Sequence, residues 1–209
     1  MELSEAVRRR RMIRSYDLSR PVPDGAVEAV LAAALRAPSA GHTQGVSFLV
    51  LRDAADRSAY WAAATGATGR VEPDRWLRGM TSAPVLILVW TSEAAYLDRY
   101  AESDKGWTDR DPGRWSAPYW FVDAGMASMA ALLSAVDHEL GACFFGVPPD
   151  RQPDVRRTFG VPSDQLSVGV ISLGYPPPGL PRRRAKGRRR SRAERIHVGY
   201  WSGQQDTRH

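Results

Sequence analysis

Residues 119–140 constrain the fold of this chain more than any other segment, because they predict a long helix with almost no polar face. Alanine, methionine and leucine recur along it, at Ala124, Ala127, Ala130, Ala131, Ala135, Met126, Met129, Leu132 and Leu133. Gly141 follows and suits the residue that ends a helix. A helix that is apolar nearly all round has to be buried on nearly all sides. In a chain of 209 residues, we therefore expect it at the centre of the fold or in a homodimer interface.

The clearest strand is residues 83–90, an apolar run without alternation that indicates cover on both faces. Further helices are expected at residues 3–11 with Ser4 as N-cap, at 25–36 with Asp24 as the capping residue, at 54–64 and at 150–159, and further strands at 46–51, 142–145 and 165–173. Residues 91–118 show no sustained period and predict a long irregular excursion, a kind of segment that often carries function. Helices alternating with short strands predict an α/β or α+β class with one mixed sheet.

The composition predicts a globular protein that folds without a disulfide or a structural metal. Seven Trp, seven Tyr and five Phe supply large apolar surfaces for a core. Cys143 is the single cysteine, which fits a reducing cytoplasm. Residues 1–20 carry charges throughout, and the apolar run 83–90 is much shorter than a bilayer span. We therefore expect a cytoplasmic protein with no signal peptide and no membrane association.

Positive charge is concentrated in two segments near the ends of the chain. Residues 8–14 and 182–195 hold 14 of the 29 basic residues but only one of the 23 acidic residues. The rest of the chain is therefore acidic, with 15 basic and 22 acidic residues. This distribution disfavours a uniformly basic nucleic-acid binder and indicates either one anion site built from both ends of the chain or two solvated basic surfaces.

Most sequence signatures of catalysis are absent. There is no dinucleotide-binding glycine motif, P-loop, zinc-protease helix, EF-hand loop or serine-hydrolase elbow. His42, His138, His197 and His209 show no metal-ligand spacing with one another or with Cys143, so no metal site is expected.

The remaining pattern suits a flat aromatic ligand that carries an anionic group. Arg10, Arg11 and Arg14 can present forked donors to a phosphate, and Arg188 or Arg189 can complete the cage. The small residues of the loop 38–44 let backbone approach a planar ring. The Phe145-Gly146 step after the long helix can offer backbone N–H groups.

Taken in order along the chain, these segments resemble the FMN-dependent nitroreductase family. The resemblance is carried by RRRMIRSYD, RAPSAGHTQ, SAPVLILVW, DAGMASMAALLSAVDHELGACFFG, LGYPPP and a basic arm ending in RIHVGYW. It covers nearly the whole chain. It implies a three-layer α-β-α sandwich over residues 1–180, with a basic arm at 181–209 that completes the FMN site and the dimer.

The resemblance also implies which residues bind FMN. Arg10, Arg11, Met12 and Arg14 match the segment that holds the phosphate and ribityl chain, with Met12 replacing a frequent Ser and contributing only backbone. Pro38, Ser39, Ala40 and Gly41 match the loop along the isoalloxazine ring, with Gln44 near the ring edge and His42 in place of a frequent Asn. Phe145 and Gly146 match the turn that approaches flavin N5 and O4. Arg188 and Arg189 match the basic position of the arm to within one or two residues.

For function, the resemblance implies hydride transfer from NAD(P)H through FMN to a nitroaromatic, quinone or similar acceptor, in a homodimer with no catalytic side chain. The excursion 91–118 is then the substrate lid, with Tyr96, Arg99, Tyr100, Lys105 and Trp107 as acceptor contacts, or else a surface loop packed on the partner subunit.

Two alternatives remain at this stage. The first is a specialised flavoenzyme of the same fold, which cleaves flavin, acts as a dehydrogenase, or reduces a deazaflavin or a biosynthetic intermediate. The second is a nucleic-acid-binding protein that uses residues 181–195, although no aromatic residues alternate with these arginines.

Overall fold

The computed structural model describes residues 1–66, 74–180 and 190–201. The chain divides into two compact units, Met1–Pro178 and Gly179–His209. Within the described residues, the helices and strands belong to the first unit. The arginines Arg188 and Arg189 lie outside the described residues.

The first unit is built on a four-stranded sheet in the order β1-β2-β4-β3. Its strands are β1 (Val46–Leu51), β2 (Val85–Ser92), β3 (Gly141–Phe145) and β4 (Gln165–Gly174). All neighbouring strands are antiparallel, so the α+β class is confirmed and the expectation of a mixed sheet is wrong. β2 and β3 do run in the same direction, but β4 inserts between them and pairs antiparallel with each. Among the described residues, the one parallel link is an isolated bridge between Met12 and Ala142.

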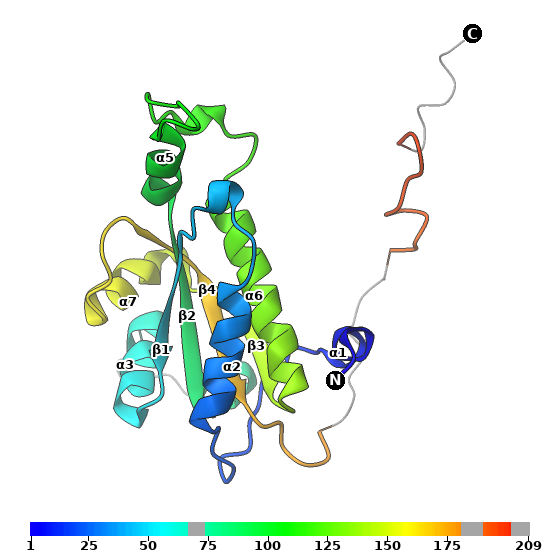
Figure 1. Ribbon diagram of the computed structural model, residues 1–209. Helices are drawn as coiled ribbons and strands as arrows, with labels where there is room; N and C mark the ends of the chain where they lie inside the picture. Colours follow the sequence, from blue (N-terminus) through cyan, green and yellow to red (C-terminus); the bar gives the residue numbers. More distant parts are fainter. Residues whose placement is uncertain (67–73, 181–189, 202–209) are drawn as a thin grey trace. The chain divides into compact units, whose positions relative to one another are not determined.

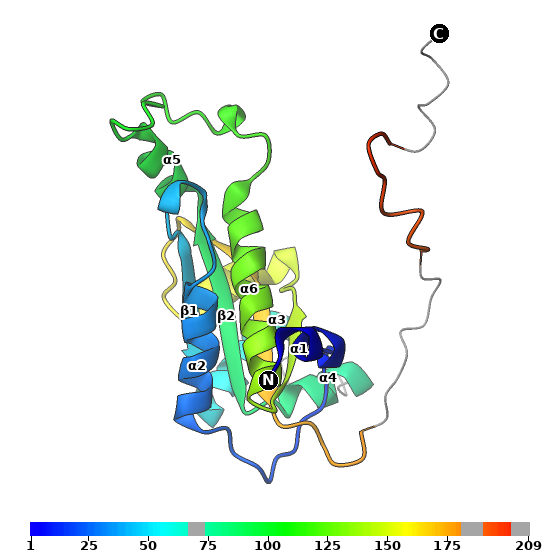
Figure 2. The ribbon, with the colours of Figure 1, turned by 45° about the vertical axis from the view of Figure 1, so that its right-hand side comes forward.

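Helices cover both faces of this sheet (Figures 1 and 2). The helices are α1 (Leu3–Arg9), α2 (Asp24–Leu35), α3 (Ala54–Thr65), α4 (Arg75–Thr81), α5 (Glu93–Ala101), α6 (Tyr119–Asp137) and α7 (Gln152–Thr158), with short 3-10 turns at Ala40–His42, Pro112–Arg114 and Pro149–Arg151. α2 and α6 pack together on one face, and α3 and α7 pack together on the other. The main core lies between the α2–α6 pair and the sheet, where every residue of β2 is buried.

Several helix ends differ from the sequence-based expectation, and α1 ends at Arg9 rather than at residue 11, which leaves Arg10 and Arg11 outside the helix. α1 begins at Leu3, so Ser4 is not its N-cap, and α2 follows Pro23 with Asp24 as its first residue. α6 ends before Gly141, which instead begins β3. Glu139 takes the left-handed conformation with φ of 60°, and the N–H groups of Glu139 and Leu140 bond the carbonyls of Val136 and Ala135 at 3.0 and 2.8 Å. This hydrogen-bond pair closes the last turn without a glycine.

Residues 91–118 are more regular than the sequence predicts. Thr91 and Ser92 complete β2, and the Ser92 side chain accepts a hydrogen bond from Ala95 N–H at 3.3 Å to cap α5. The expectation of an irregular excursion is therefore wrong over residues 91–101. The sequence did not predict α5, because charged residues are interspersed in this helix with the buried aromatic residue Tyr96.

α6 buries one face rather than all sides within a single chain. Its sheet-facing residues are buried, including Ala124, Ala127 and Ala131. On the opposite side, Phe121, Val122, Met126 and Met129 are between 39 and 44% exposed. By length and composition alone this helix could cross a membrane, but its packing on α2 and the sheet makes it a core helix.

Candidate functional site

The N-terminal arginines stand on an extended segment that runs beside β3. The Ile13 N–H donates to the Ala142 carbonyl at 2.9 Å, and Ile13 itself is buried. The buried Tyr16 then anchors the segment, because its hydroxyl donates to the Ile13 carbonyl at 2.8 Å and lies 2.7 Å from Ser172 Oγ. Successive side chains of an extended segment point to opposite sides. Arg10, Met12 and Arg14 therefore share one side.

Arg10 has the property expected of an anion ligand. Its Nη1 is buried and has no hydrogen-bond partner among the described residues. A buried guanidinium N–H without an acceptor is costly, so this atom fits a ligand phosphate or carboxylate. This observation is what makes the chain fit an FMN phosphate.

Arg14 lies close to the buried Cys143. Burial raises the pKa of the Cys143 thiol, and the positive charge of Arg14 partly offsets that effect.

Met12 and Arg11 are placed differently from one another. The Met12 sulfur accepts a hydrogen bond from the Phe144 N–H at 3.4 Å, so its side chain fills the contact with β3. Arg11 lies on the other side of the segment and lines a cavity of about 100 Å³ with Arg9, Ile13, Glu139 and Leu140. The Arg11 side chain is therefore poorly placed to bind the same anion as Arg10.

The loop 38–44 is a strained turn at the other end of the fold. Gly41, His42 and Gln44 all have positive φ, at 62°, 56° and 55°. The Ser39 hydroxyl accepts a hydrogen bond from Gln44 N–H at 2.9 Å, and His42 Nε2 lies 2.8 Å from Gln44 Nε2. Left-handed conformations at non-glycine residues persist where surrounding contacts hold them, and they cluster at functional sites.

One chain does not bring the loop and the arginines together. The loop meets the first turns of α6, where Ala40 N–H donates to Asp123 Oδ2 at 2.8 Å. The N-terminal segment meets the last turn, where the amino group of Met1 pairs with Asp137 at 2.6 Å. A helix rises about 1.5 Å per residue, so Asp123 and Asp137 are about 21 Å apart along α6. The predicted FMN residues therefore form two separate groups within a chain.

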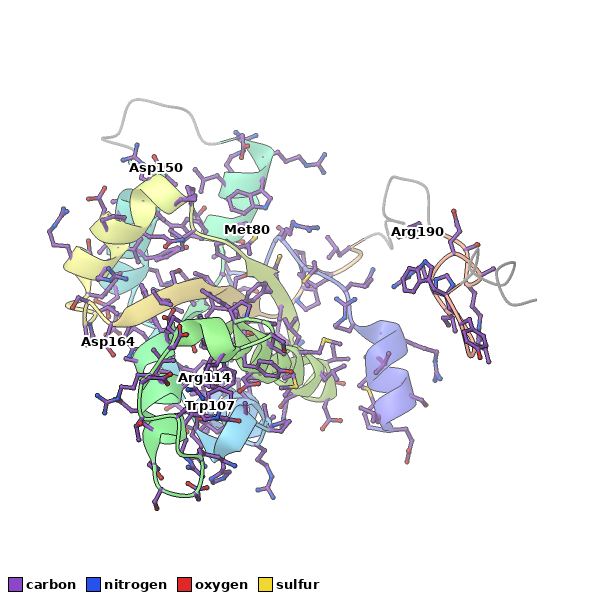
Figure 3. All side chains as sticks on the ribbon, turned by 90° about the horizontal axis from the view of Figure 1, so that it is seen from above. Met80, Trp107, Arg114, Asp150, Asp164 and Arg190 are labelled. Atoms are coloured by element: carbon purple, nitrogen blue, oxygen red, sulfur yellow. The ribbon has the colours of Figure 1, made fainter. Side chains whose placement is uncertain are left out.

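The aromatic members of the predicted lid, Tyr96, Tyr100 and Trp107, join three further rings in one cluster. Six rings pack edge to face or tilted, with centroids between 4.3 and 6.3 Å apart: Tyr96, Tyr100, Trp107, Trp115, Tyr119 and Trp120. Figure 3 shows Trp107 and Arg114 together in this region, and the Arg114 guanidinium lies 5.6 Å from the Trp107 ring centre.

The two basic residues expected to contact the acceptor, Arg99 and Lys105, lie close to Asp104. Arg99 donates from Nη1 and Nη2 to both carboxylate oxygens of Asp104, at 2.7 and 2.9 Å, and holds the pKa of that carboxyl below its usual range. Lys105 Nζ lies 3.9 Å from Asp104 and 5.6 Å from the Tyr100 ring centre. Arg99 is therefore engaged within its own chain, whereas Lys105 is exposed and Tyr100 and Trp107 remain partly exposed.

Phe145 and Gly146 end β3 beside a second aromatic group. The Phe145 ring stacks on Trp61 at 5.7 Å with an interplanar angle of 6°, and the edge of Trp76 meets it at 5.7 Å. A β-carbon at Gly146 would meet no atom within 4 Å, so the backbone there is open on its own chain. Among the described residues, no three His, Cys, Asp or Glu side chains gather as a metal-ligand group.

Two positions that contact the candidate site residues were not predicted from the sequence. Asp123 holds the loop, and Gly79 lies against the Arg14 backbone. Asp123 carried a usable signal, because it is the one charged residue between Tyr119 and Val136 in an otherwise apolar helix. Gly79 carried none, because its neighbour is 65 residues away in the chain.

Comparison with known proteins identifies the family to which the chain belongs. The model of the "Nitroreductase family" matches residues 7–175. A protein of Methanothermobacter thermautotrophicus with the provisional name NADH dehydrogenase/NAD(P)H nitroreductase is 30% identical over 178 residues, covering 84% of this chain and 78% of the relative.

Two solved structures share the fold. A provisionally named nitroreductase of Desulfovibrio desulfuricans in complex with FMN has a TM-score of 0.69 and 24% identity, covering 96% of this chain and 98% of the other. A nitroreductase of Bacteroides fragilis with bound FMN has a TM-score of 0.66 and 21% identity, covering 95 and 98%. With a family match over most of its length and a relative of this identity, the chain belongs to the nitroreductase family.

Proposed function

We propose that this protein is an FMN-dependent oxidoreductase that passes hydride from NAD(P)H to a nitroaromatic, a quinone or a similar small acceptor. The observation that carries the proposal is the buried, unpartnered Nη1 of Arg10 beside β3, in a chain of the nitroreductase family. The relatives described with bound FMN support the choice of cofactor.

In this proposal Arg10 and Arg14 bind the FMN phosphate, and Arg188 or Arg189 adds a further cation. Arg11 and Met12 contribute backbone, in keeping with the Met12 side chain being engaged by Phe144 N–H. Gly146 offers its open backbone to the flavin ring. The loop residues Pro38, Ser39, Ala40, Gly41, His42 and Gln44 line the ring.

The two groups of residues require two copies of the chain. Because the arginines and the loop lie at opposite ends of α6, a complete site needs one group from each protomer of a homodimer. The exposed apolar face of α6, with Val122, Met126 and Met129, is suited to the interface. Burial of this face in the interface would cover the apolar side of α6 that a single chain leaves exposed.

The chain's own task is binding and orientation. When bound, FMN supplies reversible hydride transfer at its N5 atom. The arginines hold its phosphate, the strained loop orients its ring, and the partly exposed Tyr100 and Trp107 offer flat surfaces to an acceptor. No side chain is assigned as acid or base. The buried Cys143 fits a reducing compartment such as the cytoplasm.

The test is an absorption spectrum of the purified protein with added FMN, recorded anaerobically before and after NADPH and then NADH. Bound flavin that bleaches supports the proposal and identifies the donor. Bound flavin that stays oxidised would favour the specialised flavoenzyme of the same fold. Failure to bind flavin would overturn the proposal.

A further inference from the structure

Asp123 is a buried carboxylate that joins three elements. The residue is 2% exposed in the first turns of α6. Its Oδ2 accepts a hydrogen bond from Ala40 N–H at 2.8 Å and another from the Tyr96 hydroxyl at 2.8 Å. One oxygen atom therefore connects α6, the loop 38–44 and α5.

The Tyr96 hydroxyl remains a hydrogen-bond donor to Asp123. Tyr96 is fully buried, and burial together with its hydrogen bond to Asp123 raises the pKa of its hydroxyl. The hydroxyl stays protonated over the working range of an enzyme and continues to donate.

Two further contacts from α5 reach the same loop. Arg99 Nε donates to the Gly41 carbonyl at 2.9 Å. The Tyr100 ring lies so close that a β-carbon at Gly41 would be 2.6 Å from it. The turn with three left-handed residues is thus held from α5 on one side and from Asp123 on the other.

We propose that Asp123 is a positioning residue that locks the loop 38–44 to α5, so that the backbone facing the flavin ring and the aromatic residues facing the acceptor keep one fixed arrangement. This inference rests on the proposed function for its consequences in FMN and acceptor binding. The attachment of the loop to α5 through Asp123 is a property of the chain and can be measured without FMN or acceptor.

The test uses two variants and two matched controls in the full-length chain. Asp123→Ala removes the acceptor and Tyr96→Phe removes one hydroxyl. Ser128→Ala is the control on the same helix, since its buried hydroxyl donates to the Ala124 carbonyl of α6 itself, at 2.7 Å. Tyr60→Phe is the control for the tyrosine change, since the Tyr60 hydroxyl is buried without a partner among the described residues.

Three quantities are measured: amide hydrogen exchange of peptides covering residues 39–45, the FMN dissociation constant from flavin fluorescence, and the acceptor KM and kcat. In Asp123→Ala we expect loop exchange and the FMN dissociation constant to rise about tenfold, the scale of a hydrogen bond to a charged group. Tyr96→Phe should raise the acceptor KM more than it lowers kcat. Asp123→Asn, which keeps an acceptor oxygen, should restore most of the loop protection.

The outcomes separate the inference from the proposed function. If Asp123→Ala and Tyr96→Phe match Ser128→Ala and Tyr60→Phe in loop exchange, the inference is overturned, whatever their melting temperatures. If the wild-type protein binds no FMN, the proposed function fails, while the exchange data still decide whether Asp123 locks the loop. If Asp123→Ala does not fold, the comparison of Tyr96→Phe with Tyr60→Phe decides.

Discussion

Gly79 of α4 packs directly against the backbone carbonyl of Arg14, so closely that a β-carbon at position 79 would overlap the carbonyl oxygen. The next turn adds a second contact, because the Tyr16 N–H donates to Ser82 Oγ at 3.0 Å. α4 thus sets the path of the arginine segment through its backbone, which makes Gly79 a determinant of the proposed phosphate site.

Gly79→Ala is therefore expected to displace this segment. Relieving the overlap should lower the free energy of unfolding by about 1–3 kcal/mol, the usual cost of overpacking, and weaken FMN binding. Urea unfolding and FMN titration measure both effects. Gly25→Ala is the control, since a β-carbon there meets no atom within 4 Å and its helical site should gain up to about 1 kcal/mol. Equal stability of the two variants would show that the contact is not tight.

Arg10→Ala should weaken FMN binding by about 1.5–3 kcal/mol, the range for a hydrogen bond to a charged group. The reason is the buried Nη1, which has no acceptor within the described chain. Arg14→Ala is expected to act in the same direction. Arg11→Ala removes the same charge from the opposite side of the segment and should cost much less. Full flavin occupancy in purified Arg10→Ala and Arg14→Ala would refute the phosphate assignment.

Local patterns predicted most elements but not how they assemble. β1, α3 and β4 were predicted to within about a residue, because their apolar periodicity is local. The sheet was expected to be mixed, since nothing in the sequence of β4 reveals that it inserts between β2 and β3. The link between Ala40 and Asp123 spans 83 residues, so it depends on the tertiary fold. Residue types could identify the loop as a candidate ring contact, but not what holds it in place.

Met129→Glu should convert the proposed homodimer into a monomer without unfolding the chain. Met129 is 40% exposed on the apolar face of α6, so a carboxylate there is solvated in the monomer and unpaired in the interface. Light scattering after size-exclusion chromatography, with circular dichroism, measures both properties. Ser58→Glu on the exposed side of α3 is the control. Ala127 and Ala131 are unsuitable sites, because both are buried against their own chain. A stable Met129→Glu dimer would place the interface elsewhere.

Asp109→Asn should lower the free energy of unfolding at neutral pH but not in acid. Arg114 donates to Asp109 Oδ2 from Nε and Nη2 at 3.0 and 2.7 Å, which holds the pKa of Asp109 below its usual range. A carboxyl with a lowered folded-state pKa adds stability above its unfolded pKa of about 4, and this stability is lost as the pH falls through the folded value. Urea unfolding at a series of pH values should therefore show a difference from wild type at about pH 7 that disappears in acid. A pH-independent difference would contradict this account.

Asp104→Asn should change which acceptors are preferred. In the wild-type protein both oxygens of Asp104 pair with Arg99, so the proposed lid should favour uncharged acceptors. The variant leaves Arg99 attached to the Gly41 carbonyl and paired with Glu102 alone, at 3.3 Å, so its charge is only partly neutralised. The ratio of kcat/KM for a nitrobenzoate to that for an uncharged nitrobenzyl alcohol should rise about two- to fivefold at low salt, and less at high salt.

Asp111→Asn is the control, because it removes a charge from the same segment, where the Asp111 carboxylate accepts the Gly113 N–H at 2.8 Å. A similar rise in Asp111→Asn would mean that the general charge of the lid, rather than the Arg99–Asp104 pair, controls the choice of acceptor.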